Sequence, residues 1–225
     1  MSRVVDLTAL SAEGEARLAA ALAGASLACF PTDTVYGVGG RLSPATVDAV
    51  VRVKGRAPDK PLQVVFPTVT LLLETVPLAP GLRTAVERLL PGPLTLVVPY
   101  PPGLDCPAPG RLTTPEGTTL DTLGVRVPDW PGPMAAMARL PFPLLASSAN
   151  PSGGADAARL DDVEPAVRAA CDLLLDGGPT GGVSSTVLDL TGLELGHGWR
   201  ILRQGAAGYD EIAARAGGKR KDGER

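Results

Sequence analysis

Short apolar runs constrain the fold of this chain most strongly, because helical patterns alternate with them along the sequence. Apolar runs of this length suit buried strands, whereas longer segments with a 3.6-residue period suit helices. The strand candidates are residues 27–30, 62–66, 94–99, 122–128, 144–146, 173–175, 184–190 and 199–205. The helix candidates are residues 11–23, 44–53, 68–76, 81–90, 160–170 and 209–216. Since we see neither an internal repeat nor an interdomain linker, the pattern predicts one α/β domain over residues 1–216.

Two stretches show neither the strand pattern nor the helix pattern. Residues 101–117 contain too many Pro, Gly and Thr residues for regular structure, which predicts a long loop. Residues 217–225 are polar and predict a disordered tail.

Composition narrows the classes of function. A net charge of −3 and an aromatic content of 4% do not favour a nucleic-acid coat or a base-stacking platform. Cys29, Cys106 and Cys171 are odd in number and far apart, which argues against a disulfide framework or a CxxC metal site. No His/Asp/Glu cluster has ligand spacing, so we expect no protein-held metal. With neither a basic leader nor an apolar run of membrane length, we expect a soluble, cytoplasmic protein without membrane contact.

The segment 54–61 concentrates positive charge. It holds two of the four lysines of the chain, Lys54 and Lys60, together with Arg56, and it directly follows the helix candidate 44–53. One interpretation is that the cations stabilise the negative end of the helix dipole, by about 0.3–1 kcal/mol at an exposed site. The other is that they converge on a polyphosphate or a carboxylate. For the second interpretation, the glycine within Lys-Gly-Arg is expected to let the backbone pass close to a ligand.

Hydroxyl and amide side chains gather at strand boundaries. The loop 31–40 combines them with three glycines, which suit a turn or a close backbone approach to a ligand. Ser148 and Asn150 follow the strand candidate 144–146, and Ser185 begins another strand candidate. In α/β sheets ligands bind beyond the carboxyl ends of strands. For any one of these residues alone, a turn with satisfied hydrogen bonds explains the pattern as well.

Arg126 stands among apolar residues and therefore needs an anionic partner, either a structural carboxylate or a ligand. A serine hydrolase with Ser148 or Ser185 as nucleophile would need a base. His197 is the only histidine, it lies between two glycines, and no GxSxG elbow occurs, so we reject this class.

Seven motifs occur together in the order of a known family. They are FPTDTVYGVGG at 30–40, KGRAPDKPL at 54–62, PGPLTLV at 91–97, GVRVP at 124–128, SSANPSG at 147–153, SSTVLDLT at 184–191 and ILRQG at 201–205. The chain resembles the YrdC family, the threonylcarbamoyl-AMP synthases, in a short form without the extra C-terminal domain. The resemblance implies a single twisted, open mixed-sheet α/β domain around a basic concave cavity. It also implies synthesis of threonylcarbamoyl-AMP and pyrophosphate from L-threonine, bicarbonate and ATP, with Mg²⁺ carried by the ATP.

The resemblance also implies site residues. Around the nucleotide and its phosphates it implies Lys54, Arg56, Lys60, Thr122, Ser148, Asn150 and Arg203. Around L-threonine it implies Thr34, Arg126 and Ser185, and it assigns Lys54 and Arg56 a catalytic role in neutralising the phosphates. Three positions depart from a common form of the pattern, which has asparagine, histidine and serine where this chain has Lys60, Val65 and Asp156. We retain Lys60, which can reach a phosphate, and leave out Val65 and Asp156.

The resemblance implies a partner as well. The product feeds the N6-threonylcarbamoyl modification of adenosine 37 in tRNA, which a separate transferase complex completes. Two alternatives stay open. One is a YciO-like relative that hydrolyses the adenylate, and the other is a non-enzymatic RNA-binding module that uses the cations of the cavity; a weak RNA contact also fits the synthase.

Overall fold

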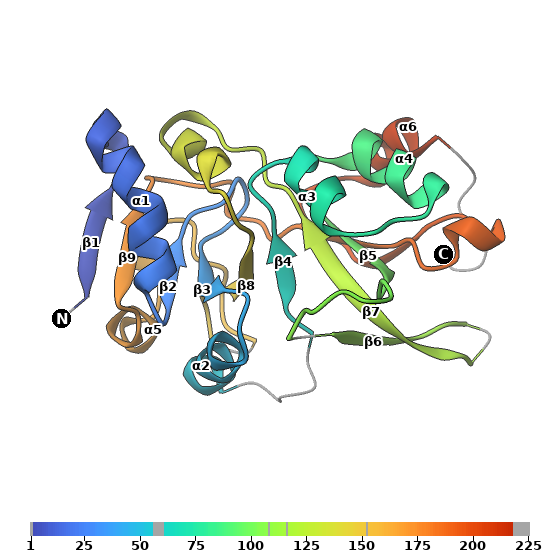
Figure 1. The fold of residues 1–225 in the computed structure, drawn as a ribbon, viewed down its shortest axis with the longest axis horizontal. Helices are drawn as coiled ribbons and strands as arrows, with labels where there is room; N and C mark the ends of the chain where they lie inside the picture. The colour runs from blue at the N-terminus through green and yellow to red at the C-terminus, as the bar shows by residue number, and fades with distance from the viewer. Residues whose placement is uncertain (1, 56–60, 108, 116, 152, 218–225) are drawn as a thin grey trace.

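The computed structural model describes residues 2–55, 61–107, 109–115, 117–151 and 153–217, which form an eleven-stranded sheet (Figure 1). The strands are β1 (Arg3–Asp6), β2 (Ala28–Phe30), β3 (Gly37–Arg41), β4 (Gln63–Val65), β5 (Leu94–Pro99), β6 (Gly110–Thr113), β7 (Thr119–Arg126), β8 (Leu144–Ser148), β9 (Leu173–Asp176), β10 (Thr186–Asp189) and β11 (Arg200–Arg203). Their order is β1-β9-β2-β3-β8-β4-β7-β5-β10-β11, and β6 pairs with β7. The sheet contains both parallel pairs, such as β4 and β7, and antiparallel pairs, such as β5 and β7, so the predicted α/β class with a mixed sheet is confirmed.

Helices flank the sheet, and local capping explains where two of them begin. The α-helices are α1 (Ala12–Gly24), α2 (Pro44–Lys54), α3 (Val69–Thr75), α4 (Pro80–Leu89), α5 (Pro165–Ala170) and α6 (Tyr209–Ala216). The 3-10 helices are η1 (Leu7–Ala9), η2 (Gly132–Arg139), η3 (Leu160–Asp162) and η4 (Leu193–Leu195). Ser11 and Ser43 accept hydrogen bonds from the first turns of α1 and α2. Among the described residues, every helix is too short or too polar to cross a bilayer.

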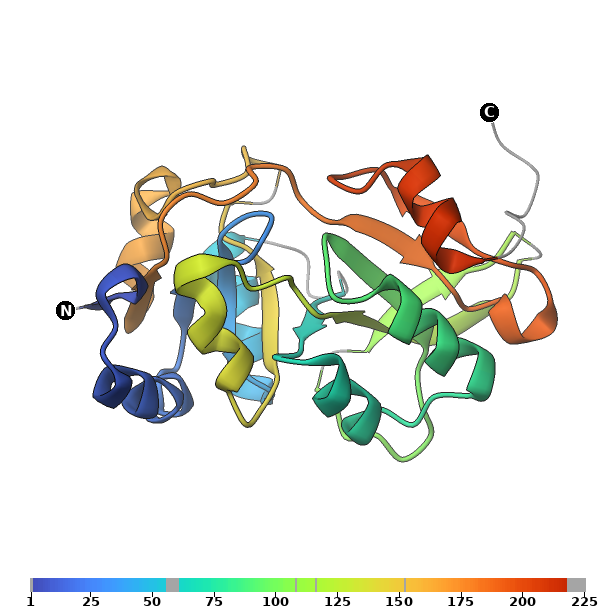
Figure 2. The ribbon, with the colours of Figure 1, turned by 90° about the horizontal axis from the view of Figure 1, so that it is seen from above.

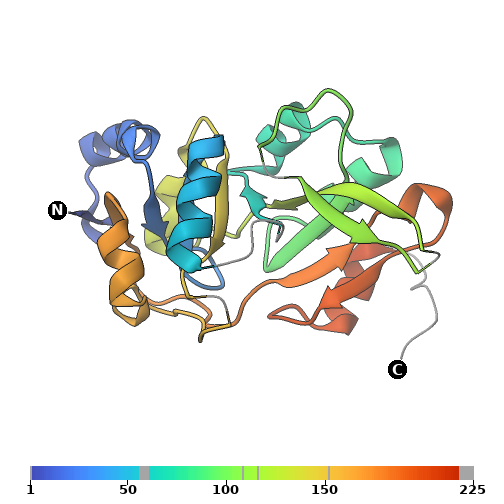
Figure 3. The ribbon, with the colours of Figure 1, turned by 90° about the horizontal axis from the view of Figure 1, so that it is seen from below.

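Alternate residues of the same strands pack into two cores on opposite faces of the sheet. On β8, Leu145 belongs to the larger core, whereas Leu144 and Ala146 belong to the smaller one. The smaller core is covered by α1 and η2, which lie near each other in Figure 2. Helices α2 to α6 contribute to the larger core, and α2 and α5 lie in front of the sheet in Figure 3.

The site lies where the smaller core ends. Along β4, β7 and β5, the residues that face away from the larger core line a cavity instead: Gln63, Val65, Thr95, Val97, Thr122, Gly124 and Arg126. Of these, Val65 is the one that also belongs to the smaller core. The period-two alternation of the strands therefore gives this half of the sheet one packed face and one face open to a ligand.

Three expectations from the sequence were wrong. The glycine-rich residues Gly37–Arg41 form strand β3, since a Cβ on Gly39 would lie 1.8 Å from the carbonyl oxygen of Leu145 and only glycine permits this approach. Within the predicted loop 101–117, residues 110–113 form β6 because they pair with the start of β7. The helix expected over 160–170 is divided into η3 and α5, because the residue before a proline, Glu164, is excluded from the helical conformation. The domain over 1–216 and the tail after it stay predictions.

Candidate functional site

Two adjoining cavities form the candidate site. The first, here called the sheet cavity, has a volume of about 310 Å³ and is floored by β4, β5 and β7. The second, here called the loop cavity, has a volume of about 510 Å³ and lies between the loop after β8 and the loops flanking β10 and β11. Both are lined by Ser147, Ser148, Ser184 and Arg203. A ligand with two differently shaped parts can therefore occupy both.

Arg126, on β7, is the most deeply buried arginine that lines the sheet cavity, and only 2% of it is exposed. Its Nη2 donates to Thr34 Oγ1 at 2.6 Å and to Thr32 Oγ1 at 3.2 Å, and it pairs with the carboxylate of Asp33. Burial lowers the pKa of Arg126, and the charge of Asp33 opposes this shift. Of the two partners left open by the sequence, the structural carboxylate is thus present.

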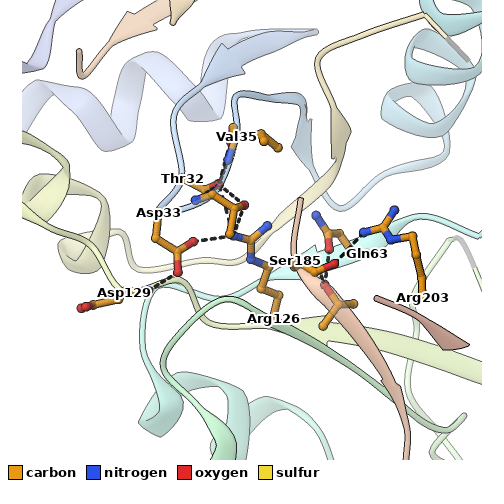
Figure 4. Close-up of polar contacts among 10 residues, drawn as sticks. Thr32, Asp33, Val35, Gln63, Arg126, Asp129, Ser185 and Arg203 are labelled. Atoms are coloured by element: carbon orange, nitrogen blue, oxygen red, sulfur yellow. Dashed lines mark hydrogen bonds and ion pairs between the residues drawn. The ribbon is translucent and has the colours of Figure 1, made fainter. Parts of the chain in front are cut away.

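The Nε atom of Arg126 is also buried, and it has no hydrogen-bond partner among the described residues. A buried donor without a partner costs about 1–3 kcal/mol, unless a ligand or a water molecule accepts from it. Figure 4 shows Arg126 between Thr32 and Asp33 on one side and Ser185 and Arg203 on the other. The geometry therefore suits a ligand acceptor, such as a carboxylate oxygen, beside the guanidinium group.

The loop that contacts Arg126, which contains Thr32, Asp33 and Thr34, is held in place by further hydrogen bonds. Thr32 Oγ1 donates to the carbonyl oxygen of Val35 at 2.7 Å, and Asp33 Oδ2 accepts from the backbone N–H of Asp129 at 3.1 Å. Thr34 is 1% exposed. The acceptors around the guanidinium group are consequently held in place before any ligand binds.

Ser185 closes the other side of the sheet cavity, directly before β10. Its Oγ lies 2.8 Å from Thr95 Oγ1, which in turn donates to Gln63 Oε1 at 2.8 Å. The carbonyl oxygen of Ser185 accepts from Arg203 Nη2 at 2.9 Å. Thr122, which is 4% exposed, lines the same cavity from β7.

Lys54 connects α2 to the loop cavity. It is the last residue of the helix and is 6% exposed. Its Nζ donates to the carbonyl oxygen of Ser148, to that of Asn150 at 2.6 Å, and to Asn150 Oδ1 at 3.1 Å. The interpretation as an exposed charge at a helix end is therefore wrong for Lys54, whose ammonium group is buried and fastens the loop after β8.

The loop after β8 is held together by further bonds. Ser148 Oγ donates to Asn150 Oδ1 at 2.6 Å, and Asn150 Nδ2 donates to the carbonyl oxygen of Gly154 at 2.6 Å. Asp156 lies beside them and accepts from the backbone N–H of Ser184 at 3.2 Å. Asp156 thus joins the loops that form the two walls of the loop cavity.

The structure explains the glycine at position 55 by its backbone conformation and not by the expected close approach to a ligand. Its φ is +56°, and it caps the C-terminus of α2 in the left-handed conformation that favours glycine. None of the described atoms lies within 4 Å of a Cβ built there, so no close approach accounts for this glycine. Arg56 and Lys60 lie outside the described residues.

The structure brings together the other residues expected from the sequence. Arg126, Thr122, Ser148, Ser185 and Arg203 line the sheet cavity, and Thr34 contacts Arg126. Lys54, Ser148, Asn150 and Arg203 line the loop cavity. Gln63 and Thr95 were not predicted as site residues, although a polar residue within an apolar strand run is a signal that could have identified both. Asp156 was noted and left out, yet it lines the loop cavity.

Comparison with known proteins identifies relatives along most of the chain. Residues 20–205 match the model of the Sua5/YciO/YrdC family, described as telomere recombination. The threonylcarbamoyl-AMP synthase of Bacillus subtilis is 36% identical over 178 residues, which cover 77% of this chain and 49% of that protein. A Mycobacterium leprae protein is 33% identical over 207 residues, which cover 90% of this chain and 87% of that protein. The chain therefore spans about half the length of the Bacillus relative.

Two solved structures resemble this chain over nearly its whole length. The crystal structure of Pyrococcus abyssi Sua5 complexed with L-threonine has a TM-score of 0.76 at 29% identity, and the match covers 97% of this chain and 62% of that one. The structure of E. coli YciO has a TM-score of 0.74 at 16% identity and covers 94% of this chain and 100% of that one. At such low identity, the likeness to YciO concerns the fold alone.

Proposed function

This chain belongs to the Sua5/YciO/YrdC family, and we propose that it makes threonylcarbamoyl-AMP and pyrophosphate from L-threonine, bicarbonate and ATP. The observation that carries the proposal is the buried Nε of Arg126, a donor without a partner among the described residues, in a cavity that adjoins the loop cavity lined by Lys54. A carboxylate on Arg126 leaves the rest of an amino acid directed towards Ser185 and Arg203.

We assign L-threonine to the sheet cavity and the triphosphate to the loop cavity. Arg126 takes the carboxylate, with Thr34 and Ser185 as neighbours. Around the nucleotide we propose Thr122, Ser148, Asn150 and Arg203 together with the cations of segment 54–60. The volumes of the cavities, about 310 and 510 Å³, are within the range of small-molecule sites.

The chemistry needs positioning and charge neutralisation more than a conventional base. The amine of threonine and bicarbonate form a carbamate with loss of water. A carbamate oxygen then attacks the α-phosphorus of ATP in line, and the bond to the pyrophosphate oxygen breaks. Mg²⁺ bound to the phosphates accompanies the leaving pyrophosphate. Among the described residues, no group of three His, Cys, Asp or Glu side chains comes together to hold a metal.

Lys54 and Arg56 are the proposed catalytic cations. Because the protons of Lys54 are directed at carbonyl and amide oxygens of the loop after β8, its contribution is twofold. It shapes the Ser148–Asn150 turn, and its positive charge lowers the energy of phosphates in the loop cavity. A separate transferase complex would use the product to modify tRNA in the cytoplasm.

The test is pyrophosphate release from ATP, with L-threonine and bicarbonate supplied together and separately. We expect release only when both are present, with threonylcarbamoyl-AMP detected by mass spectrometry. Equal release without threonine would overturn the synthase. A protein that instead consumes added threonylcarbamoyl-AMP is a hydrolase of the kind proposed as the alternative. Salt-dependent RNA binding without threonine-dependent release would favour an RNA-binding module.

A further inference from the structure

A chain of hydrogen bonds crosses the floor of the sheet cavity through three side chains. Gln63 on β4 accepts from Thr95 on β5 at 2.8 Å, and Thr95 Oγ1 lies 2.8 Å from the Oγ of Ser185, directly before β10. Strand β7 lies between β4 and β5, and its residue opposite Gln63 is Gly124. Because Gly124 has no side chain, Gln63 can reach across β7 to Thr95. Figure 4 shows Gln63 next to Ser185 in this part of the cavity.

The chemistry of these groups fixes the direction of each proton. The amide oxygen of Gln63 can only accept, so it takes the single hydroxyl proton of Thr95. Thr95 Oγ1 then has only lone pairs for Ser185, and the hydroxyl proton of Ser185 must point at Thr95. Thr95 and Ser185 are 6% and 3% exposed, so bulk water does not compete for these protons. The remaining lone pairs of Ser185 Oγ are directed away from Thr95.

We propose that Gln63 and Thr95 are positioning residues that make Ser185 an obligate hydrogen-bond acceptor. The sheet cavity then has two unlike ends. Arg126 offers donors for a carboxylate, and Ser185 offers lone pairs for an N–H or O–H group of the same ligand. This polarity selects a small molecule that carries an anionic group and a hydrogen-bond donor, as an α-amino acid does. The proposal rests on the proposed function only in taking L-threonine as that ligand.

Two substitutions interrupt this chain of hydrogen bonds without removing Ser185. Thr95→Val keeps the shape of the side chain and removes its hydroxyl, and Gln63→Met removes the acceptor. In both variants the proton of Ser185 is free to turn towards the ligand. We expect the Kd of L-threonine, measured by calorimetry, and its KM to rise about 3- to 10-fold, the effect of one misdirected hydrogen bond. The Kd of ATP and the melting temperature should change little.

Two further variants serve as controls. Thr95→Ser keeps the hydroxyl and should restore threonine binding to within about 2-fold of the parent. Thr113 on β6 and Thr119 on β7 form another pair of hydroxyl groups, with 2.9 Å between their Oγ1 atoms, outside this chain of hydrogen bonds. Thr113→Val removes one hydroxyl of that pair and should leave threonine binding unchanged. Unchanged threonine binding in both Thr95→Val and Gln63→Met would overturn the proposal, as would equal losses in Thr95→Ser and Thr95→Val.

Neutron diffraction of the free protein tests the proton positions without any ligand. We expect deuterium density between Thr95 Oγ1 and Gln63 Oε1 and between Ser185 Oγ and Thr95 Oγ1. A proton of Ser185 directed into the cavity would overturn the inference. If the parent protein neither binds L-threonine nor releases pyrophosphate, the proposed function fails, and the neutron result still decides whether Ser185 is held as an acceptor.

Discussion

Replacing Lys54 with methionine tests what the buried ammonium group does. Methionine has a similar length but neither charge nor donor. In the parent, Lys54 Nζ donates to the carbonyl oxygens of Ser148 and Asn150 and to Asn150 Oδ1. The substitution therefore removes the attachment of α2 to the loop after β8, and it removes one positive charge from the loop cavity.

The expected magnitudes separate the possible roles. A charge at an exposed helix end contributes about 0.3–1 kcal/mol to stability and nothing to turnover. Losing the donor to these two carbonyl oxygens costs about 2–6 kcal/mol, since each unsatisfied buried group costs about 1–3 kcal/mol. For a chain of this size, 3 kcal/mol corresponds to a fall in melting temperature of about 6–12 °C. Loss of a cation that stabilises the leaving pyrophosphate adds a barrier of about 2.7–4 kcal/mol, or a 100- to 1000-fold lower kcat.

We expect Lys54→Met to show both effects, in a thermal melt and in a steady-state assay of pyrophosphate release below the melting transition. Arg52→Met is the matched control, because Arg52 is an exposed cation in the last turn of the same helix. Lys54→Arg keeps the charge and should retain at least about tenfold more turnover than Lys54→Met. Neither role holds for Lys54 if Lys54→Met melts like Arg52→Met and turns over at more than about a third of the parent rate.

Three further predictions concern buried groups. Arg126→Lys should raise the KM of L-threonine about 10- to 100-fold and change the Kd of ATP less, because lysine lacks the two-pronged geometry for a carboxylate; a lower ATP affinity with an unmoved threonine KM would contradict the assignment. Asp33→Asn should lower the free energy of unfolding by about 3–5 kcal/mol in denaturant titrations, because it leaves the buried charge of Arg126 without its anionic partner; a loss below about 1 kcal/mol would contradict this. Burial raises the pKa of the Cys171 thiol to about 12, so little thiolate exists at pH 8 and a thiol reagent should modify Cys171 only after unfolding; rapid labelling of the folded protein would contradict the burial.

The sequence predicted elements whose signals are local and missed those that depend on a distant partner. Ser43 followed by proline marks the start of α2 by itself, and the structure confirms the cap. Nothing within residues 110–113 marks a strand, because β6 exists through its pairing with β7. Likewise Gly37–Arg41 has only one side chain typical of strands, that of Val38, and its place between β2 and β8 depends on close backbone approach.

The same distinction between local signals and distant partners applies to the candidate site. The motifs identified which residues gather around the cavities, because motif order along a chain can be read without a structure. They did not reveal that Asp33 already pairs with Arg126, or that Lys54 donates to backbone carbonyl oxygens. Both contacts join residues more than 90 positions apart in the sequence. Residue type predicts that such groups need partners, but only the fold decides which partners they have.

The pairing of Asp33 with Arg126 has a consequence for charge in the proposed reaction. A guanidinium group paired with one carboxylate is close to neutral, so the carboxylate of L-threonine is left without a compensating cation in a buried cavity once the amine has lost its proton to form the carbamate. Carbamate formation replaces the amine by a further anionic group, next to the triphosphate. Among the described residues, Arg203 is the cation that lines both cavities, and its charge is close enough to lower the pKa of Arg126. We therefore propose that Arg203, together with the cations of segment 54–60, compensates these anions locally, although the net charge of the chain is −3.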